Sequence, residues 1–227
     1  MNHFSRRSFL AAASATALAG CAPQRDQLVA SAPAIPPEYY AVYGPRPDEQ
    51  FPLPAVDLSE VDPRFLRQEV DFSASQPVGS IVVDPTERYL YYVQSRGRAI
   101  RYGVGVGRAG YQFRGGAIVG RKAMWPRWTP TANMIEDNPE KNGPWAGGME
   151  PGLENPLGAR ALYLYNGGRD TMYRIHGTNE PTSIGENVSS GCVRMFNQDV
   201  IDLYDRTPVG AAVLVRPSVM PASRGLA

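Results

Sequence analysis

Short apolar runs separated by turn residues make up most of the chain from about residue 78 onward. These runs are rich in β-branched and aromatic residues, which is typical of β-strands. In one of them, the apolar residues from Ile100 to Val106 alternate with polar or small ones, as expected for a strand with one buried face. The pattern predicts strands at residues 80–83, 89–94, 99–106, 117–121, 161–165, 172–176 and 211–215.

One segment near the C-terminus has helical periodicity instead. A helix is predicted with Asn197 as its N-cap, because short polar side chains accept hydrogen bonds from the first free amides of a helix. Asp199 suits the dipole of the first turn, and Pro208 ends the helix. Its apolar side consists of Val200, Ile201, Leu203 and Tyr204. The expected fold is mainly β with a minor α component, a β-sandwich or partial barrel with one or two short helices.

Residues 124–160 have no clear periodicity and contain all three tryptophans, Trp125, Trp128 and Trp145. Long insertions without regular structure in compact domains usually form binding loops or lids, so we expect a lid-like loop here. The alternative is that the tryptophans cap the hydrophobic core. The sequence pattern leaves both interpretations open.

The N-terminal region predicts export. Residues 1–20 contain the pair Arg6-Arg7 followed by an apolar stretch too short to span a bilayer, which indicates a signal peptide of the twin-arginine type. Leu18-Ala19-Gly20-Cys21 resembles a lipobox, so Cys21 is expected to carry a lipid. The alternatives are an uncleaved short anchor, or cleavage nearby that leaves Cys21 as a free thiol. We expect a periplasmic, membrane-anchored lipoprotein of the bacterial envelope.

The remaining chain divides by composition. Residues 21–58 are rich in proline and are expected to form an extended tether. Residues 59–77 carry some apolar side chains and are expected to pack on the domain as an arm. The compact domain is placed at residues 78–217, followed by a tail at 218–227.

Charge and histidine content exclude several classes of function. The chain has 23 basic and 22 acidic residues, so no strong field favours binding to nucleic acid. Only His3 and His176 are present, and the first lies in the leader. A histidine-rich zinc site therefore lacks ligands, and no metal is expected.

Cys192 and His176 are the candidate catalytic residues. If Cys21 carries lipid, Cys192 has no disulfide partner, and a lone thiol in an oxidising compartment is a liability unless its reactivity is used. A cysteine and a histidine within hydrogen-bond range are the minimum for acyl transfer through a thioester. The alternative is a buried, inert cysteine.

Residues beside this pair are candidates for holding the substrate. The backbone N–H groups of Gly191 and Cys192 suit an oxyanion hole, and Ser190 lies in the same tight turn. Gly177 follows the histidine and is placed in the same set. Arg194 is expected either to bind a substrate carboxylate or to form a structural ion pair.

Two motifs together resemble the active-site signature of the L,D-transpeptidase catalytic domain family. They are His176-Gly177-Thr178 and the run from Ser189 to Met195, SSGCVRM. Many members of that family have histidine and asparagine where this chain has Ser190 and Arg194. The resemblance covers roughly residues 76–216, with further support from Ile81–Asp84, Tyr102–Gly107, Trp125–Pro130 and Asn155–Gly158.

The resemblance implies a β-rich catalytic fold with Cys192 as nucleophile and His176 as proton acceptor and donor. It also implies a peptidoglycan stem tetrapeptide as acyl donor, an amine acceptor on a second stem peptide or an envelope protein, and no cofactor. Hydrolysis by an L,D-carboxypeptidase or endopeptidase is the alternative activity, and a non-catalytic wall-binding lipoprotein is another. A papain-like peptidase fits least, because there the cysteine usually precedes the histidine in the chain.

Overall fold

A computed structural model gives the fold of the chain after its N-terminal segment. It describes residues 35–107, 113–188 and 192–218. The predictions for the leader, Cys21, Ser190 and Gly191 therefore lie outside the described residues. Within the described ranges, every helix is too short or too polar to cross a membrane.

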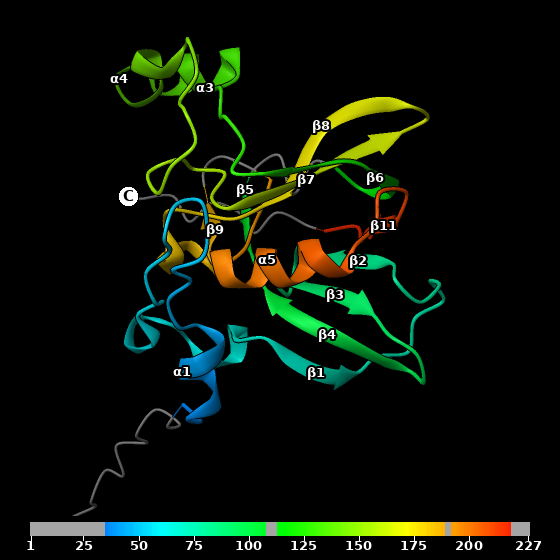
Figure 1. The fold of residues 1–227 in the computed structure, drawn as a ribbon. Helices are drawn as coiled ribbons and strands as arrows, with labels where there is room; N and C mark the ends of the chain where they lie inside the picture. Colours follow the sequence, from blue (N-terminus) through cyan, green and yellow to red (C-terminus); the bar gives the residue numbers. More distant parts are fainter. Residues whose placement is uncertain (1–34, 108–112, 189–191, 219–227) are drawn as a thin grey trace, which may run out of the picture. The chain divides into compact units, whose positions relative to one another are not determined.

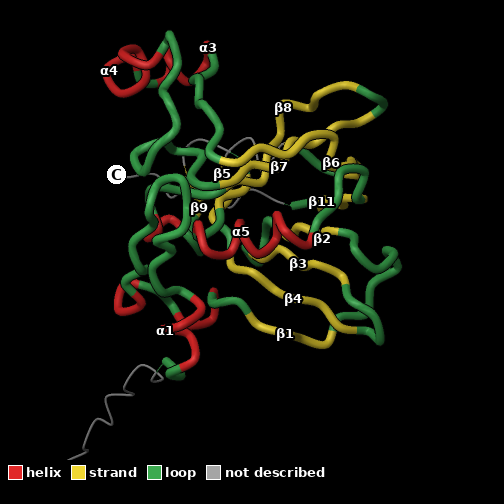
Figure 2. The backbone as a smooth tube through the Cα atoms, in the orientation of Figure 1, coloured by secondary structure: helices red, strands yellow, loops and turns green. Residues whose placement is uncertain are grey.

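The strands of the described chain form one mixed sheet of eleven strands (Figures 1 and 2). They are β1 (Gln68–Asp71), β2 (Ile81–Asp84), β3 (Tyr89–Val93), β4 (Arg98–Gly103), β5 (Gly105–Gly107), β6 (Gly115–Met124), β7 (Arg160–Asn166), β8 (Arg169–His176), β9 (Asn187–Val188), β10 (Val193–Arg194) and β11 (Ala212–Val215). Across the sheet the order is β1-β4-β3-β2-β11-β6-β7-β8-β10-β5-β9. The mainly β fold expected from the sequence is confirmed.

The strand predicted at residues 99–106 differs from the others because the structure divides it at Val104. β4 pairs with β1 and β3, whereas β5 pairs with β9 and β10. The glycines on either side allow this change of partner. A β-carbon at Gly103 would collide with Phe65, and one at Gly105 would collide with the carbonyl oxygen of Ser183. The apolar alternation continues through both strands and therefore conceals the break.

β11 joins the two groups of strands into one sheet. Val213 pairs in parallel with Ile81 of β2 and antiparallel with Ala117 of β6. In Figure 1 the red β11 accordingly lies between the cyan β2 and the green β6. The strand that completes the sheet comes from the end of the described chain.

The helices are short. They are α1 (Glu38–Val42), α3 (Ala132–Asp137), α4 (Pro139–Asn142) and α5 (Asn197–Arg206), together with 3₁₀ turns at Leu58–Glu60, Pro63–Phe65, Gly143–Trp145 and Pro181–Ser183. α5 has the predicted extent, but the prediction that Asn197 is its N-cap is wrong. The cap is Phe196, which makes no side-chain cap hydrogen bond, because the Asn197 side chain binds two loops beside the helix.

The main core lies between the sheet and α5. Val200 and Leu203 of α5 are fully buried against side chains of β2, β4, β7 and β8. The largest contributors to this core are Ile81, Leu90, Tyr102, Leu162, Leu164, Ile175 and Met195. This packing fixes α5 against the ends of the strands that carry the candidate catalytic residues.

Residues 35–58 differ from the extended tether expected there. Tyr43 and Leu53 are buried, and the Tyr43 hydroxyl donates to Asp199 of α5 at 3.0 Å. The Gln198 amide donates to the carbonyls of Gly44 and Pro54. The segment therefore folds onto the domain. Its proline content indicates local stiffness, whereas its aromatic and aliphatic side chains determine that it packs. Phe65 and Leu66 of the following arm are also buried.

The stretch from 124 to 160 carries α3 and α4, which extend away from the sheet at the top of Figure 1. Trp125 is buried and its Nε1 donates to Glu49, so for this residue the core-capping interpretation holds. Trp145, in contrast, is 40% exposed. The stretch thus has a buried base and an exposed outer part.

Candidate active site

Cys192 and His176 lie at the ends of two neighbouring parallel strands. In the register of β8 and β10, Val193 pairs with Ile175 and Arg194 pairs with His176. Cys192 directly precedes β10, so it lies one strand across and two positions along from His176. With standard strand spacings this corresponds to roughly 8 Å between the two Cα atoms. Side chains at that separation can approach each other across the sheet.

Cys192 is a free and buried thiol, 8% exposed. Its Sγ–H donates to the backbone carbonyl of Met172 at 3.7 Å. Burial raises the pKa of the thiol, and the negative charge of Asp170 adds to the rise. The backbone and the guanidinium of Arg174 act in the opposite direction and lower this pKa. The resting sulfur is therefore protonated at neutral pH.

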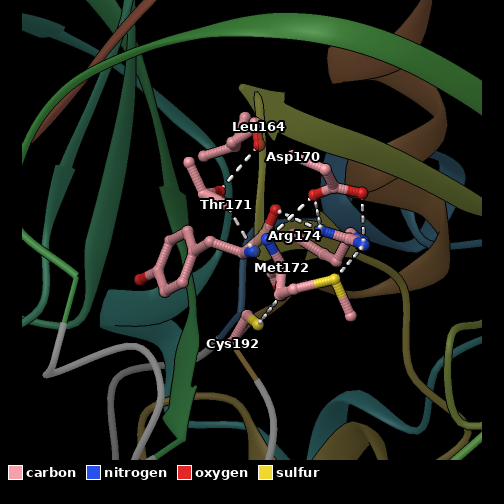
Figure 3. Close-up of polar contacts among 7 residues, drawn as sticks. Leu164, Asp170, Thr171, Met172, Arg174 and Cys192 are labelled. Carbon is pink, nitrogen blue, oxygen red and sulfur yellow. Dashed lines mark hydrogen bonds and ion pairs between the residues drawn. The ribbon is translucent and has the colours of Figure 1, made fainter. Parts of the chain in front are cut away.

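A kink in β8 directs the Met172 carbonyl toward the sulfur. Met172 has φ +61°, and the register between β7 and β8 shifts at this place. Two side chains fix the kink, as Figure 3 shows. Asp170 accepts the Met172 N–H at 2.8 Å and binds Arg174 through both oxygens. Thr171 donates to the Leu164 carbonyl at 2.7 Å. Irregular strand positions of this kind are frequent beside active sites because they redirect a group.

The imidazole of His176 is 5% exposed and its tautomer follows from its partner. Nδ1 lies 2.7 Å from the carbonyl oxygen of Gly177. A carbonyl can only accept, so Nδ1 carries the proton and Nε2 is the unprotonated nitrogen of the neutral ring. This backbone carbonyl is the orienting group that the sequence motifs leave unidentified.

Burial lowers the pKa of His176 to about 4. Arg194 and Arg174 lower this pKa further, whereas the carbonyls of Gly177 and Pro156 raise it. The imidazole is consequently neutral at physiological pH, which is the form that accepts a proton. The described site thus holds a neutral thiol and a neutral base at the ends of two neighbouring strands.

Two loops enclose the imidazole, and Asn197 binds both. Its Nδ2 donates to the Thr178 carbonyl at 2.9 Å, and its Oδ1 accepts the Ala159 N–H at 2.9 Å. The sequence analysis missed this role because an asparagine at a helix start is normally interpreted as a cap. The adjacent glycines of the motifs, Gly158 and Gly177, are the signal that points to a close packing partner.

Arg194 forms an ion pair, which is one of the two roles expected for it. Its Nη1 lies 2.7 Å from Oε2 of Glu180, and its side chain is 13% exposed. Glu180 also lies 3.6 Å from Nζ of Lys141 in α4. The sequence analysis did not single out Glu180, since isolated charged residues in loops carry no pattern. These charges connect the α3–α4 segment to β10.

Two members of the expected oxyanion set, Ser190 and Gly191, lie outside the described residues. Among the residues that are described, no group of three or more histidine, cysteine, aspartate or glutamate side chains is arranged to hold a metal ion.

The fold and the site define a mainly β domain with a thiol and an imidazole on adjacent parallel strands. Residues 79–215 match the family model described as YkuD: L,D-transpeptidase catalytic domain, and the chain belongs to this family. The resemblance seen in the sequence motifs is thereby confirmed.

Relatives from Escherichia coli (strain K12) support the same membership. "Probable L,D-transpeptidase ErfK/SrfK" is 36% identical over 138 residues, which cover 60% of this chain and 43% of that protein. "Probable L,D-transpeptidase YbiS" is 38% identical over 136 residues, which cover 59% and 43%. This chain therefore matches less than half the length of these curated relatives. A crystal structure described as a "Probable carnitine operon oxidoreductase caia from Brucella melitensis" is 45% identical over 73% of this chain and 98% of that one, with a TM-score of 0.48.

Proposed function

We propose that the chain is a peptidoglycan L,D-transpeptidase in which Cys192 is the nucleophile and His176 the general base. The observation that carries the proposal is the imidazole whose Nδ1 is bound by the Gly177 carbonyl, on the strand next to the one that Cys192 precedes. Membership of the L,D-transpeptidase family supports the choice of reaction.

In the first half-reaction the Cys192 thiol rotates from the Met172 carbonyl toward Nε2 of His176. The imidazole accepts the thiol proton as sulfur attacks the carbonyl carbon of the third residue of a donor tetrapeptide. The bond to the terminal D-alanine nitrogen breaks, and the imidazolium returns its proton to that departing amine. The products are a thioester on Cys192 and free D-alanine.

In the second half-reaction an acceptor amine attacks the thioester carbon. His176 accepts the amine proton and passes it to the departing sulfur, which restores the thiol. A new amide bond replaces the one that was broken, so the cycle needs neither a cofactor nor ATP. The acceptor is a second stem peptide, giving a cross-link, or an amine on an envelope protein.

Proton transfer is coupled to the attack in this scheme. Burial raises the pKa of Cys192 and lowers that of His176, so both groups are uncharged before the substrate binds. The developing oxyanion is assigned to the backbone N–H groups of Gly191 and Cys192. Loss of one such donor in other acyl-transfer sites costs about 2.7–4 kcal/mol of barrier.

Mass spectrometry of the purified protein tests this function. Incubation with a tetrapeptide muropeptide or a carbapenem is expected to add the acyl group to wild-type protein and not to Cys192→Ala. Circular dichroism controls for folding of both proteins. A folded wild-type protein that forms no adduct on Cys192 would falsify the proposal.

Analysis of the released products distinguishes transfer from hydrolysis. Transfer gives cross-linked dimers, whereas an L,D-carboxypeptidase or endopeptidase gives only shortened monomers. In cells, a muropeptide profile that is unchanged by Cys192→Ala would favour a non-catalytic wall-binding protein.

The cellular location is part of the same proposal. Arg6-Arg7 and Cys21 support export by the twin-arginine route and a lipid anchor in the bacterial envelope. Labelling of cells with radioactive palmitate is expected to mark the wild-type protein and not Cys21→Ala. Incorporation into both would contradict the assignment of Cys21.

A further inference from the structure

The carbonyl groups that surround the His176 imidazole belong to two separate loops. The Gly177 carbonyl bonds Nδ1 directly and follows β8. The Pro156 carbonyl, which lies in the loop before β7, also forms a hydrogen bond with the ring and raises its pKa. The orientation of the imidazole therefore depends on the relative position of these loops.

One side chain, that of Asn197, connects the two loops. Its amide nitrogen donates to the carbonyl of Thr178, and its oxygen accepts from the amide of Ala159, both at 2.9 Å. Thr178 is the neighbour of Gly177, and Ala159 lies three residues after Pro156, so both bonds of Asn197 are close to the carbonyls that bind the ring. Asn197 itself is held by the first turn of α5, which packs in the main core.

The glycines of both loops make this contact close. A β-carbon on Gly177 or on Gly158 would collide with Oδ1 of Asn197. Gly158 also has φ +61°, a conformation that favours glycine. Both loops thus approach the Asn197 amide more closely than any other residue type at these two positions would allow.

We propose that Asn197 is a positioning residue that holds the Gly177 carbonyl against Nδ1 of His176 and so fixes the imidazole in the tautomer with Nε2 unprotonated. Asn197 acts through the backbone of the two loops, at Ala159 and Thr178. Its importance for acyl transfer rests on the proposed function, whereas its effect on the tautomer does not.

Nuclear magnetic resonance of ¹⁵N-histidine-labelled protein tests the tautomer directly. The chain contains two histidines, so a His3→Gln background leaves His176 as the sole signal. At pH 8, where the imidazole is neutral, Asn197→Ala is expected to change the single Nδ1–H tautomer into a mixture with the Nε2–H form. Asn197→Asp keeps the size and the acceptor for Ala159 but removes the donor to Thr178, so a smaller change is expected.

Gln198→Ala is the matched control. The neighbouring Gln198 also donates its side-chain amide to two backbone carbonyls, but these belong to Gly44 and Pro54, away from the imidazole. It is expected to lower stability and leave the tautomer unchanged. A folded Asn197→Ala protein with an unaltered Nδ1–H tautomer would overturn the proposal, as would an equal change in Gln198→Ala.

Acylation kinetics provide the second readout. Asn197→Ala is expected to lower the acylation rate of Cys192 at saturating tetrapeptide by roughly 10²-fold, the lower end of a general-base contribution, with KM little changed. An equal loss in Gln198→Ala would contradict the proposal. If wild-type protein forms no thioester while the tautomer still responds to Asn197→Ala, the proposed function fails and the positioning role stands.

Discussion

The side-chain oxygen of Asn197 fills the space that a β-carbon on Gly177 would occupy. Gly177→Ala is therefore expected to displace its own carbonyl from Nδ1 of His176. Overpacking of this kind costs about 1–3 kcal/mol of stability, and the acylation rate is expected to fall more steeply than stability alone explains. Denaturant unfolding and acylation by a tetrapeptide measure the two effects.

Gly116→Ala provides the comparison for that change. Gly116 lies in β6 and has open space where its β-carbon would be added. We expect its acylation rate to match that of wild type. An active Gly177→Ala protein would show that the close contact is not required.

The charges around the kink of β8 are expected to set the pKa of the thiol. Asp170 raises the pKa of Cys192 and Arg174 lowers it. Asp170→Asn should therefore lower this pKa, and Arg174→Gln should raise it. The pH dependence of the rate of alkylation by iodoacetamide reports the midpoint for each protein. Asp71→Asn, on the exposed strand β1, is the control and should leave the midpoint unchanged. Shifts of the opposite sign would contradict this electrostatic account.

Burial of His176 is expected to make the domain sensitive to acid. The folded protein has a pKa of about 4 at this group, below its ordinary value of 6.5. Between these values the unfolded chain binds a proton that the folded protein excludes, so stability is lost as pH falls from about 6.5 toward 4. Over this range the free energy of unfolding falls by an amount on the order of 3 kcal/mol. Urea unfolding at several pH values measures it, and His176→Gln should remove this part of the slope. An identical slope in the variant would refute the assignment.

A partly buried ion pair is one of the contacts between residues 35–58 and the rest of the domain. Glu49 binds Arg160 through both oxygens, at 2.6 and 2.8 Å, and also accepts from Trp125. Glu49→Ala leaves the Arg160 guanidinium buried without this partner. The free energy of unfolding is therefore expected to fall by roughly 3 kcal/mol.

Glu69→Ala is the control for that measurement, because its pair with Arg98 is exposed and should contribute less than about 1 kcal/mol. Urea unfolding compares the two variants. Equal decreases in the free energy of unfolding would show that burial does not strengthen the Glu49–Arg160 pair.

Strands β2 to β8, β11 and α5 could be predicted from the sequence because their apolar periodicity is local, whereas the short strands β1, β9 and β10 were missed. The break at Val104 could not, since it depends on contacts of Gly103 and Gly105 with Phe65 and Ser183, far away in the chain. The packing of residues 35–58 was also missed. Proline content is visible in a sequence, whereas the partners of Tyr43 are found only in the folded chain.

For the site, motifs identified Cys192 and His176 as candidates, and their roles stay predictions. The Met172 carbonyl and the Gly177 carbonyl could not be predicted, because every residue has a backbone carbonyl and only the fold selects among them. Asn197 stands at the start of the predicted helix, where an asparagine is most commonly explained as the helix cap.

The position of β11 has a consequence for how the molecule is made. Ile81 and Ala117 become neighbours of one strand only through Val213. During synthesis β2 and β6 therefore each keep one unpaired edge until β11 has emerged from the ribosome. Completion of this sheet is thus a late event of synthesis, and loss of a few residues from Ala212 onward would leave these two edges open in the middle of the sheet.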